Sequence, residues 1–582
     1  MKKILITLFV LFFTNSFSNN KELYHRIKIE YSNALEFNTL LNSGICIDHG
    51  IHKKNEYFES DFSESEISIL TELNFNYSIV INDVSSFYKN RNIPSHKDYV
   101  SNTNAKNFSC ETDENSSYTT PQNYDIKDGS DFGGFYTYSE MLAELDEMSQ
   151  LFPNLISTRS DVKDESIFSE PHPHQTYEDR FLQWVKISDN PNTNENEPEV
   201  LYTSVHHARE PASLQQLIFY MWYLLENYET DQEIRDIVDN TELYFIPCVN
   251  PDGYVYNETD EPQGGGMWRK NRFNTHGVDN NRNYSYIDNN GNEVWNTAGT
   301  SNNTGNDTYA GTEPFSESEN SAIRYFVENN DFKLALNNHT YSNLLLYPFG
   351  YDYNQFTEDN EVFESISSLL VQQNGYENIL SSELYPAAGD SDDFMYGMLT
   401  TENGGTRDKI FAMTPEIGSS FWPAAATIED LCKEMIFLNL NAARLVNNYA
   451  TLNESSSYTI EGLSFNSTYE LQRLGISEPG DFSVTFIPVS DNISSVESVN
   501  NYNQLVLGET VEGSFSITLN SNINVGDDVS YNLVLNNGAF DKEYQITKIF
   551  GEYSAIFTDS EGAFSGNWIT NSNEWAETNE DY

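Results

Sequence analysis

The sequence predicts an α/β protein in three parts: a small α+β segment, a large domain with a mixed, twisted sheet flanked by helices, and an all-β, sandwich-like region. Between residues 135 and 452, apolar strand-like runs alternate with longer helical patterns. Shorter extended and helical stretches alternate before residue 88, whereas after residue 457 short alternating runs lie between turns rich in Gly, Asn and Asp. The 582-residue chain also exceeds a single core, because cores stop growing at about 250–300 residues.

Residues 1–18 have the layout of a secretory signal peptide. Lys2 and Lys3 precede an apolar run over residues 4–13. Small residues follow, with Ser16 and Ser18 at the −3 and −1 positions of a cleavage site. The run is too short for a membrane anchor, which needs about 20 apolar residues, and no later stretch of the sequence approaches that length. We therefore expect a protein that is secreted or associated with the cell surface, without stable insertion into a membrane.

The segment over residues 23–88 suits a small α+β unit. Extended stretches are predicted over residues 24–30 and 77–81, and helices over residues 34–43 and 64–73. Residues 89–134 follow as a polar linker, rich in Asn, Ser, Asp and Thr and weak in periodicity.

The large domain, residues 135–452, is predicted from strands and helices in turn. Strand-like runs and helical patterns alternate in the order 199–205, 213–229, 243–249, 318–328 and 334–336. A last helical run over residues 431–449 closes the domain. In the region 457–582, alternating runs predict strands over residues 482–487, 513–519 and 529–535.

Composition and charge exclude several classes of protein. With 38% hydrophobic and 14% aromatic residues, the chain is not disordered throughout. Its 31 Lys and Arg against 89 Asp and Glu give a net charge of −58, which repels nucleic acid and anionic lipid. Its 4 cysteines form no CxxC pair, so a disulfide scaffold and a cysteine-built zinc site are excluded. Any cluster of arginines in such an acidic chain needs a local reason.

Polar clusters in the large domain follow the strand-like runs, which is where ligand sites of open α/β sheets gather. The first is His-Ala-Arg-Glu at residues 207–210. A His and a Glu three residues apart offer a nitrogen and a carboxylate to a metal, and His339, after the run 334–338, supplies a third ligand. Zinc accepts such a set with an open position for water, although the His-x-x-Glu spacing alone is a weak signal. His206, beside this pair, is interpreted as a bystander.

Further clusters in the same domain strengthen the first. They are Asn-Pro-Asp-Gly at 250–253 with Trp-Arg-Lys at 268–270, Gly-Val-Asp-Asn-Asn-Arg-Asn at 277–283, Tyr-Pro-Ala-Ala-Gly-Asp-Ser-Asp-Asp at 385–393 and Thr-Pro-Glu-Ile-Gly at 414–418. With these motifs in this order, the segment resembles a zinc metallocarboxypeptidase of the carboxypeptidase A/B type, particularly its secreted bacterial, carboxypeptidase T-like branch. The motifs span the whole segment, and residues 23–88 resemble the propeptide of the same family.

The resemblance implies a role for each polar residue. It implies that one zinc ion (Zn2+) is ligated by His207, Glu210 and His339. It makes Glu416 the general base and acid, and Arg269 the group that polarises the scissile carbonyl. The residues that it implies for the terminal carboxylate of the substrate are Asn281, Arg282 and Tyr385. Those that it places along subsites further up the peptide are Arg209 and Tyr341.

The chemistry of these residue types agrees with the implied roles. Zinc with three protein ligands lowers the pKa of a bound water toward about 7. A carboxylate at Glu416 can take the proton of that water and pass it to the leaving amine. A fixed cation at Arg269 acts when the carbonyl oxygen becomes negative, and loss of one such donor costs about 3–4 kcal/mol. The guanidinium of Arg282 matches a terminal carboxylate in two hydrogen bonds, whereas an internal peptide bond lacks that partner.

Asp392 falls where the resemblance places the floor of the pocket for the departing side chain. The A-type enzymes have an apolar residue there and the B-type an aspartate. A buried carboxylate is compensated by a cation but left unpaired by an apolar side chain, so we predict a preference for C-terminal Lys or Arg. Two alternatives stay open: Asp392 belongs to an acidic turn with Asp390 and Asp393, or the enzyme also accepts apolar residues, as carboxypeptidase T-like enzymes do.

The resemblance also implies a proenzyme and its partners. We expect residues 23–88 to cover the active site as an inhibitory prosegment, released when an activating protease cuts the linker. The expected substrates are the C-termini of peptides or proteins. The region after residue 457 lacks a cluster of metal-ligand residues, so we expect it to serve attachment, folding or export. Calcium binding (Ca2+) by the acidic loops stays open, and no sequence feature supports it.

Two rival functions are weighed against this one. A secreted zinc peptidase that trims peptidoglycan peptides has related chemistry, but Asn281, Arg282 and Tyr385 favour ordinary protein C-termini. A catalytically silent zinc- or peptide-binding protein is the other rival. Glu416 and Arg269 argue against it, because a binding module needs neither a base nor a cation for an oxyanion.

Overall fold

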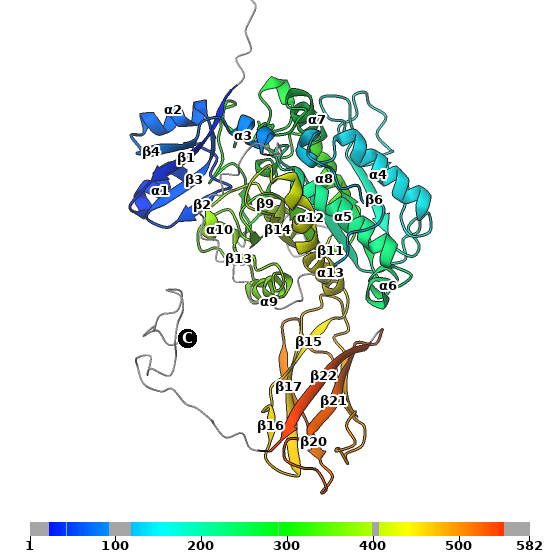
Figure 1. Cartoon of the computed structure of the whole chain (residues 1–582). Helices are drawn as coiled ribbons and strands as arrows, with labels where there is room; N and C mark the ends of the chain where they lie inside the picture. The colour runs from blue at the N-terminus through cyan, green and yellow to red at the C-terminus, as the bar shows by residue number, and fades with distance from the viewer. Residues whose placement is uncertain are drawn as a thin grey trace, which may run out of the picture. The chain divides into compact units, whose positions relative to one another are not determined.

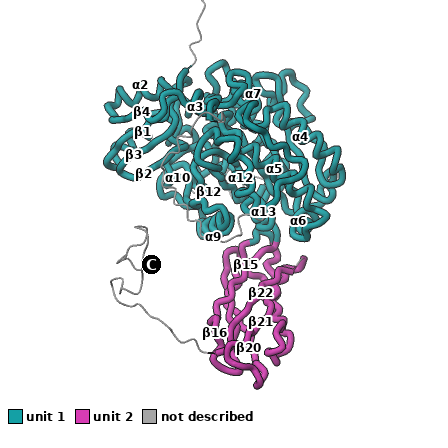
Figure 2. The backbone as a smooth tube through the Cα atoms, in the orientation of Figure 1, with its two compact units in different colours: residues 1–447, 475–477 teal, residues 448–474, 478–582 magenta. Residues whose placement is uncertain are grey.

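The computed structural model of the chain (Figure 1) describes residues 22–41, 43–91, 118–288, 290–397, 407–539 and 541–551. The predicted signal peptide, Cys110 and most of the predicted linker lie outside the described residues. The chain divides into two compact units, one with residues 1–447 and 475–477, the other with residues 448–474 and 478–582 (Figure 2). The predicted α+β segment and the large domain as far as residue 447 therefore belong to the first unit. Residues 448–452, predicted to end the large domain, belong to the second unit together with the β-rich region except residues 475–477.

The N-terminal segment, blue in Figure 1, is a four-stranded antiparallel sheet with three helices. Its elements are β1 (Tyr24–Glu30), α1 (Ala34–Leu41), β2 (Ile51–Lys53), β3 (Tyr57–Ser63), α2 (Glu64–Glu72), β4 (Tyr77–Ile81) and α3 (Val84–Asn90). The strand order is β2-β3-β1-β4. Helix α2 begins at a capping box, in which Ser63 and Glu66 each bond the other's backbone N–H. Ile27, Ile29 and Leu70 are fully buried in the core of this segment, so the predicted α+β character is confirmed.

The large domain is built on an eight-stranded sheet of order β13-β12-β14-β11-β7-β8-β6-β5. Its strands are β5 (Ser160–Asp161), β6 (Gln183–Ile187), β7 (Glu199–Ser204), β8 (Glu242–Ile246), β11 (Phe332–Asn338), β12 (Leu344–Tyr347), β13 (Glu377–Leu380) and β14 (Phe411–Glu416). A separate two-stranded sheet contains β9 (Tyr286–Ile287) and β10 (Glu293–Val294). Strands β8, β7, β11 and β14 run parallel, β6 is antiparallel to both of its neighbours, and β12 is antiparallel to β14 but parallel to β13, so the predicted mixed sheet is confirmed.

Helices flank this sheet (Figure 1). They are η1 (Phe132–Gly134), α4 (Tyr138–Leu151), α5 (Pro211–Asn227), α6 (Gln232–Val238), α7 (Pro251–Asp260), η2 (Phe273–Thr275), η3 (Asn280–Arg282), α8 (Ser318–Glu328), α9 (Asn360–Leu370), α10 (Ser381–Leu384), α11 (Ser391–Gly397), α12 (Ala425–Glu434) and α13 (Ile436–Leu445). Helix α5 is buried from Pro211 to Leu225, which places it at the centre of the domain. Among the described residues, no helix is long and apolar enough to cross a bilayer.

The last helix of the large domain differs from the prediction. Instead of one helix over residues 431–449, α12 begins at Ala425 and α13 ends at Leu445, with a break at Met435. Met435 caps both helices, and its backbone N–H donates to the carbonyls of Cys432 and Lys433, which tightens the turn. The apolar run continues through this break, so periodicity alone did not indicate it.

The second unit contains two sheets that share one apolar core. Its strands are β15 (Ala450–Glu454), β16 (Thr459–Ile460), β17 (Ser464–Arg473), β18 (Phe482–Pro488), β19 (Ser498–Tyr502), β20 (Thr510–Thr518), β21 (Asp528–Asn536) and β22 (Asp541–Phe550). The sheets have the orders β15-β17-β20 and β16-β22-β21-β18-β19. Alternate residues of β21, among them Tyr531 and Leu533, face the core, so the predicted all-β character is confirmed.

Candidate metal and substrate site

The predicted metal ligands lie in loops that leave the carboxyl ends of neighbouring parallel strands. His207 and Glu210 follow β7, and His339 follows β11, the next strand in the sheet. Glu416 is the last residue of β14, which pairs with β11 on its other side. The N–H of His339 donates to the carbonyl of Pro415 at 2.9 Å, and the N–H of Ile417 donates to the carbonyl of His339 at 3.0 Å. The sheet register therefore sets His339 beside Glu416.

The three predicted ligands converge on one point. Nδ1 of His207 lies 2.8 Å from Oε1 of Glu210, and Nδ1 of His339 lies 2.9 Å from Oε2 of Glu210. The two Nδ1 atoms are 3.1 Å apart. All three side chains are buried. Two imidazole nitrogens and a carboxylate in this arrangement fit a zinc site with three protein ligands.

Asp279 orients the first of these ligands. Its Oδ1 lies 3.2 Å from Nε2 of His207, the ring nitrogen that points away from Glu210. A carboxylate behind a metal-binding histidine fixes the tautomer and orientation of the ring. Burial, and then Arg269, lowers the pKa of His207, which favours the neutral imidazole that a metal requires. Burial opposes ionisation of Asp279, but Arg269 and His207 hold its pKa well below the ordinary value.

His206 and Arg269 occupy the surroundings of the ligands. Nε2 of His206 lies 3.0 Å from the hydroxyl of Tyr284, so this histidine has a partner of its own. Arg269 is held by Asp279, whose Oδ2 accepts from Nε at 3.0 Å and from Nη2 at 2.8 Å. The carbonyl of Arg269 also accepts from the N–H of Ala208 at 2.8 Å, which ties its backbone to the ligand loop.

A second group of residues in the site consists of Arg282, Asn281 and Tyr385. Nη2 of Arg282 lies 3.3 Å from the hydroxyl of Tyr385, and its Nη1 donates to the carbonyl of Asn281 at 2.7 Å. The side-chain oxygen of Asn281 accepts from the N–H of Ser391 at 3.0 Å. Arg282 is buried, which makes its charge available only to a partner that enters the site.

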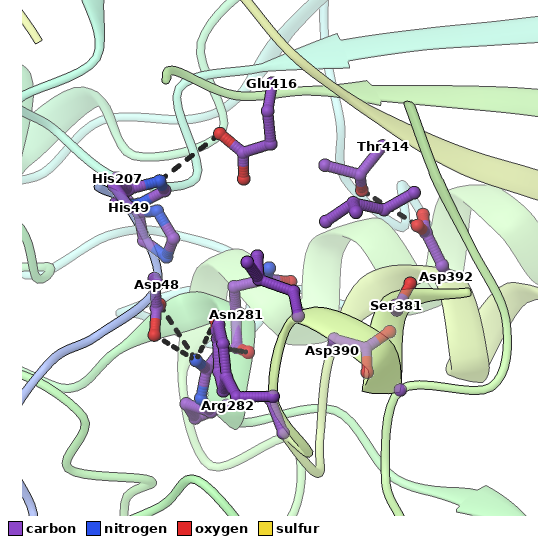
Figure 3. Close-up of a pocket in the computed structure, with 15 residues that line it drawn as sticks. Asp48, His49, His207, Asn281, Arg282, Ser381, Asp390, Asp392, Thr414 and Glu416 are labelled. Carbon is purple, nitrogen blue, oxygen red and sulfur yellow. Dashed lines mark hydrogen bonds and ion pairs between the residues drawn. The ribbon is translucent and has the colours of Figure 1, made fainter. Parts of the chain in front are cut away.

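One cavity joins the two groups (Figure 3). It is lined by His207 and Glu416 at the metal ligands, and by Arg282, Tyr385 and Asp392. Asp392 is buried beside Thr414, which donates to its Oδ2 at 2.8 Å. The side-chain amide of Asn337 donates to its Oδ1, also at 2.8 Å. Burial, and then Asp390, raises the pKa of Asp392 to about 7.

Arg209 and Tyr341 do not line this cavity but contact the N-terminal segment. Arg209 lies over the ring of Phe421 at 4.5 Å, and its Nη1 donates to Asp307 at 2.9 Å. The hydroxyl of Tyr341 lies 3.5 Å from that of Ser60 in β3. Their predicted roles in binding the peptide further from its end stay predictions.

Two residues at the site come from the N-terminal segment and were not predicted. Oδ1 and Oδ2 of Asp48 each accept from Nη2 of Arg282 at 2.8 Å, and Asp48 also pairs with Arg269. His49 reaches the metal ligands, with its Nε2 3.0 Å from Oε1 of Glu210 and its Nδ1 3.3 Å from Oε2 of Glu416. The sequence signal that could have indicated them is the Asp-His-Gly stretch at residues 48–50, in a segment interpreted as inhibitory. An aspartate suits the arginines of such a site, and a histidine suits its metal and carboxylates.

Comparison with protein families matches residues 163–437 to the zinc carboxypeptidase family. The zinc carboxypeptidase of Saccharothrix mutabilis subsp. capreolus is 30% identical over 296 residues, which are 48% of this chain and 63% of that protein. Rat (Rattus norvegicus) carboxypeptidase B is 34% identical over 237 residues, 38% of this chain and 53% of that protein. The chain thus spans less than two thirds of the length of either relative.

Solved structures show the same fold at low sequence identity. Carboxypeptidase A from Helicoverpa armigera aligns with a TM-score of 0.54 and 19% identity, covering 73% of this chain and 97% of that one. Thrombin activatable fibrinolysis inhibitor aligns with a TM-score of 0.52 and 17% identity, covering 72% and 98%. The predicted fold class of the large domain is therefore confirmed from outside the chain as well.

Proposed function

We propose that this chain, whose residues 163–437 belong to the zinc carboxypeptidase family, is a secreted zinc exopeptidase that removes single residues from the C-termini of peptides. The observation that carries the proposal is the shared cavity. Its lining combines His207 and Glu416, at the metal ligands, with Arg282 and Asp392. Three parts of a bound peptide can then lie side by side in this cavity: the bond to be cleaved, the terminal carboxylate and the side chain of the last residue.

His207, Glu210 and His339 would hold the zinc ion in this reaction. When bound, zinc polarises a water molecule and lowers its pKa toward about 7, which supplies a nucleophile at neutral pH. Glu416 accepts a proton of the attacking water on its carboxylate as the water oxygen bonds to the carbonyl carbon, and it returns the proton to the leaving amine as the peptide C–N bond breaks. Arg269, fixed by Asp279, stabilises the negative charge that develops on the carbonyl oxygen.

Arg282 restricts cleavage to the last peptide bond, because it binds the free C-terminal carboxylate. It is a buried cation in a chain with a net charge of −58, and Tyr385 lies 3.3 Å from its guanidinium. The carboxylate of Asp48 already occupies this position with two contacts of 2.8 Å, so the position accepts a carboxylate. A free C-terminus can take the same place, whereas an internal peptide bond offers no charge to Arg282.

Asp392 supplies a preference for C-terminal Lys or Arg. Its carboxylate receives hydrogen bonds from two neutral side chains, those of Asn337 and Thr414. A lysine or arginine side chain that enters the cavity compensates this buried acid, while an apolar side chain leaves it uncompensated. Acceptance of apolar residues as a second specificity is the alternative that the assay below distinguishes.

The N-terminal segment supports synthesis as an inhibited proenzyme. Asp48 fills the position proposed for the substrate carboxylate. Further along, Arg91 donates to the carbonyl of Trp422 at 2.6 Å, and Lys89 pairs with Glu261. An activating protease would cut the predicted linker after this anchor. The charged and apolar pattern of residues 1–18 supports export of the chain.

A peptide hydrolysis assay tests this function. The substrates are a short peptide that ends in Arg, its C-terminal amide and the same peptide ending in Leu, each incubated with the full chain before and after limited proteolysis. We expect the trimmed protein to release free Arg, to spare the amide, to lose activity with a chelator and to regain it with zinc. Zinc-loaded trimmed protein that releases no amino acid from any of them would refute the proposal.

A further inference from the structure

The loop between α1 and β2 carries His49 into the metal site. Ile45 and Ile47 point into the core of the N-terminal segment, and the N–H of Cys46 donates to Glu66 at 2.8 Å. Gly50 then turns the chain with φ of +151°, and a Cβ there would lie 2.4 Å from the carbonyl oxygen of Glu59. The loop is thus anchored on both sides of His49, and a larger residue than glycine does not fit the turn.

The ring of His49 is 2% exposed and fixed by its neighbours. Phe421 packs edge-on against it, with ring centroids 5.1 Å apart, and the Tyr341 ring lies at 6.0 Å. Its Nε2 lies 3.0 Å from Oε1 of Glu210. One donor atom from each of His49, His207 and Glu210 lies within 4.8 Å of the other two. This spacing is that of ligands around a single ion.

We propose that His49 is a fourth protein ligand of the zinc ion in the uncleaved chain. The inference rests on the proposed function, because it requires that His207, Glu210 and His339 hold zinc. A catalytic zinc site keeps one coordination position open for water or substrate, whereas a site with four protein ligands is closed. The N-terminal segment then inhibits at the metal itself, in addition to covering Arg282 with Asp48.

The second ring nitrogen of His49 supports ligation over simple contact. Its Nδ1 lies 3.3 Å from Oε2 of Glu416, while Nε2 faces Glu210. His207 has the same arrangement, with one nitrogen facing Glu210 and the other 3.2 Å from Asp279. A carboxylate behind the ring is the usual support of a metal-binding histidine. His49 thus has a carboxylate near each ring nitrogen, as His207 does, and one of these carboxylates belongs to the proposed base.

The test compares metal coordination in the uncut and trimmed protein. X-ray absorption at the zinc edge counts the imidazoles bound to zinc in the purified full chain and after removal of the N-terminal segment. We expect the count to fall by the imidazole of His49 on removal. No substitution is needed for this measurement, so a variant that fails to fold does not affect it.

Variants of the full chain give a second readout. We expect His49→Gln to lose zinc to a chelator at least about 10-fold faster than the wild type, since even the loss of an outer-shell partner of a metal ligand costs about 10- to 100-fold in metal affinity. The matched control is His25→Gln, a histidine of the same segment whose nearest carboxylate, in Glu64, is 3.9 Å away. A second control, Asp48→Asn, tests whether the contact between Asp48 and Arg282, and not His49, retains the zinc. Both controls should stay within about twofold of the wild type.

The outcomes distinguish failure of the ligation by His49 from failure of the proposed function. An unchanged imidazole count on trimming, with equal zinc loss from wild type and His49→Gln, would overturn ligation and leave His49 as an ion-pair neighbour of Glu416. Trimmed protein that binds zinc and releases C-terminal residues would keep the proposed function in that case. Trimmed protein that binds no zinc would instead remove both.

Discussion

The two ends of the cavity treat buried charge in opposite ways. At the metal end, two buried carboxylates have partners that are charged or predicted metal ligands: Glu210 contacts His207 and His339, and Asp279 contacts Arg269. At the other end, no lysine or arginine among the described residues pairs with Asp392. The pKa of Asp392 is accordingly raised to about 7, by burial first and Asp390 next.

The acidic end is therefore incomplete without a ligand. The carboxylate of Asp393 is satisfied by the backbone N–H groups of Gly350 and Tyr351, and Oδ2 of Asp390 has no hydrogen-bond partner among the described residues. Buried acids without a cation are costly in a folded protein unless a bound cation compensates them. Under the proposed function, the contrast separates two tasks: the reaction takes place where the chain compensates its own buried charges, and substrate selection takes place where it leaves a carboxylate for the substrate to compensate.

The largest expected effect concerns the proposed base at the metal end. Glu416→Gln keeps the shape of the side chain but removes its basic oxygen, so kcat of the trimmed enzyme should fall about 100- to 10,000-fold. Zinc content, measured by metal analysis, should stay at the wild-type value because Glu416 is not an assigned ligand. An unchanged kcat would mean that another residue takes the proton of the water.

The next effect concerns the acidic end. Asp392→Ala removes the charge that a C-terminal Arg compensates, and a broken buried pair costs about 3–5 kcal/mol, a factor of about 100 or more. The ratio of kcat/KM for peptides ending in Arg and in Leu should fall accordingly. A ratio that stays constant in Asp392→Ala would contradict the assignment.

Arg282 also lines the cavity, and its loss should have a smaller effect. Hydrogen bonds to charged groups contribute about 1.5–3 kcal/mol, so Arg282→Ala should lower kcat/KM about 10- to 100-fold. The loss should appear chiefly in KM for peptides with a free C-terminus. Activity on the C-terminal amide should change little, so the discrimination between acid and amide should narrow. Equal losses on both substrates would instead indicate a structural role.

The smallest effect is a pH dependence of specificity. Because the pKa of Asp392 is raised to about 7, its carboxyl is increasingly neutral below that pH and attracts no cation. The Arg-to-Leu ratio of kcat/KM should therefore fall by up to about tenfold per pH unit below 7 and level off above it. Titration of groups common to both reactions cancels in this ratio. Asp392→Asn should give a low ratio that does not vary with pH.

Local sequence patterns predicted much of the fold and most of the site. The alternation of apolar residues indicated β1, β4 and α2, and the order of the motifs indicated His207, Glu210 and His339 as a set. The strand and helix predictions succeeded because each depends on a few neighbouring residues, whereas the ligand set rested on a resemblance that spans the whole segment. The structure brings the set together without testing its chemistry.

Contacts between distant parts of the chain could not be predicted in the same way. Asp279 stands in a motif that drew attention, but its place behind His207 depends on how two loops pack. Asp48 and His49 depend on the docking of a whole segment against the large domain. The break at Met435 depends on packing as well, since neither Gly nor Pro indicates it.

The position of Asp48 and His49 in one turn has a consequence for the onset of activity. Every contact that they make at the site is non-covalent, so a protease that cuts after Arg91 breaks none of them. The excised fragment, still folded around its own apolar core, would stay bound to the enzyme as a non-covalent inhibitor. Peptide turnover would then begin only when the cut fragment dissociates, so dilution as well as proteolysis would set its timing.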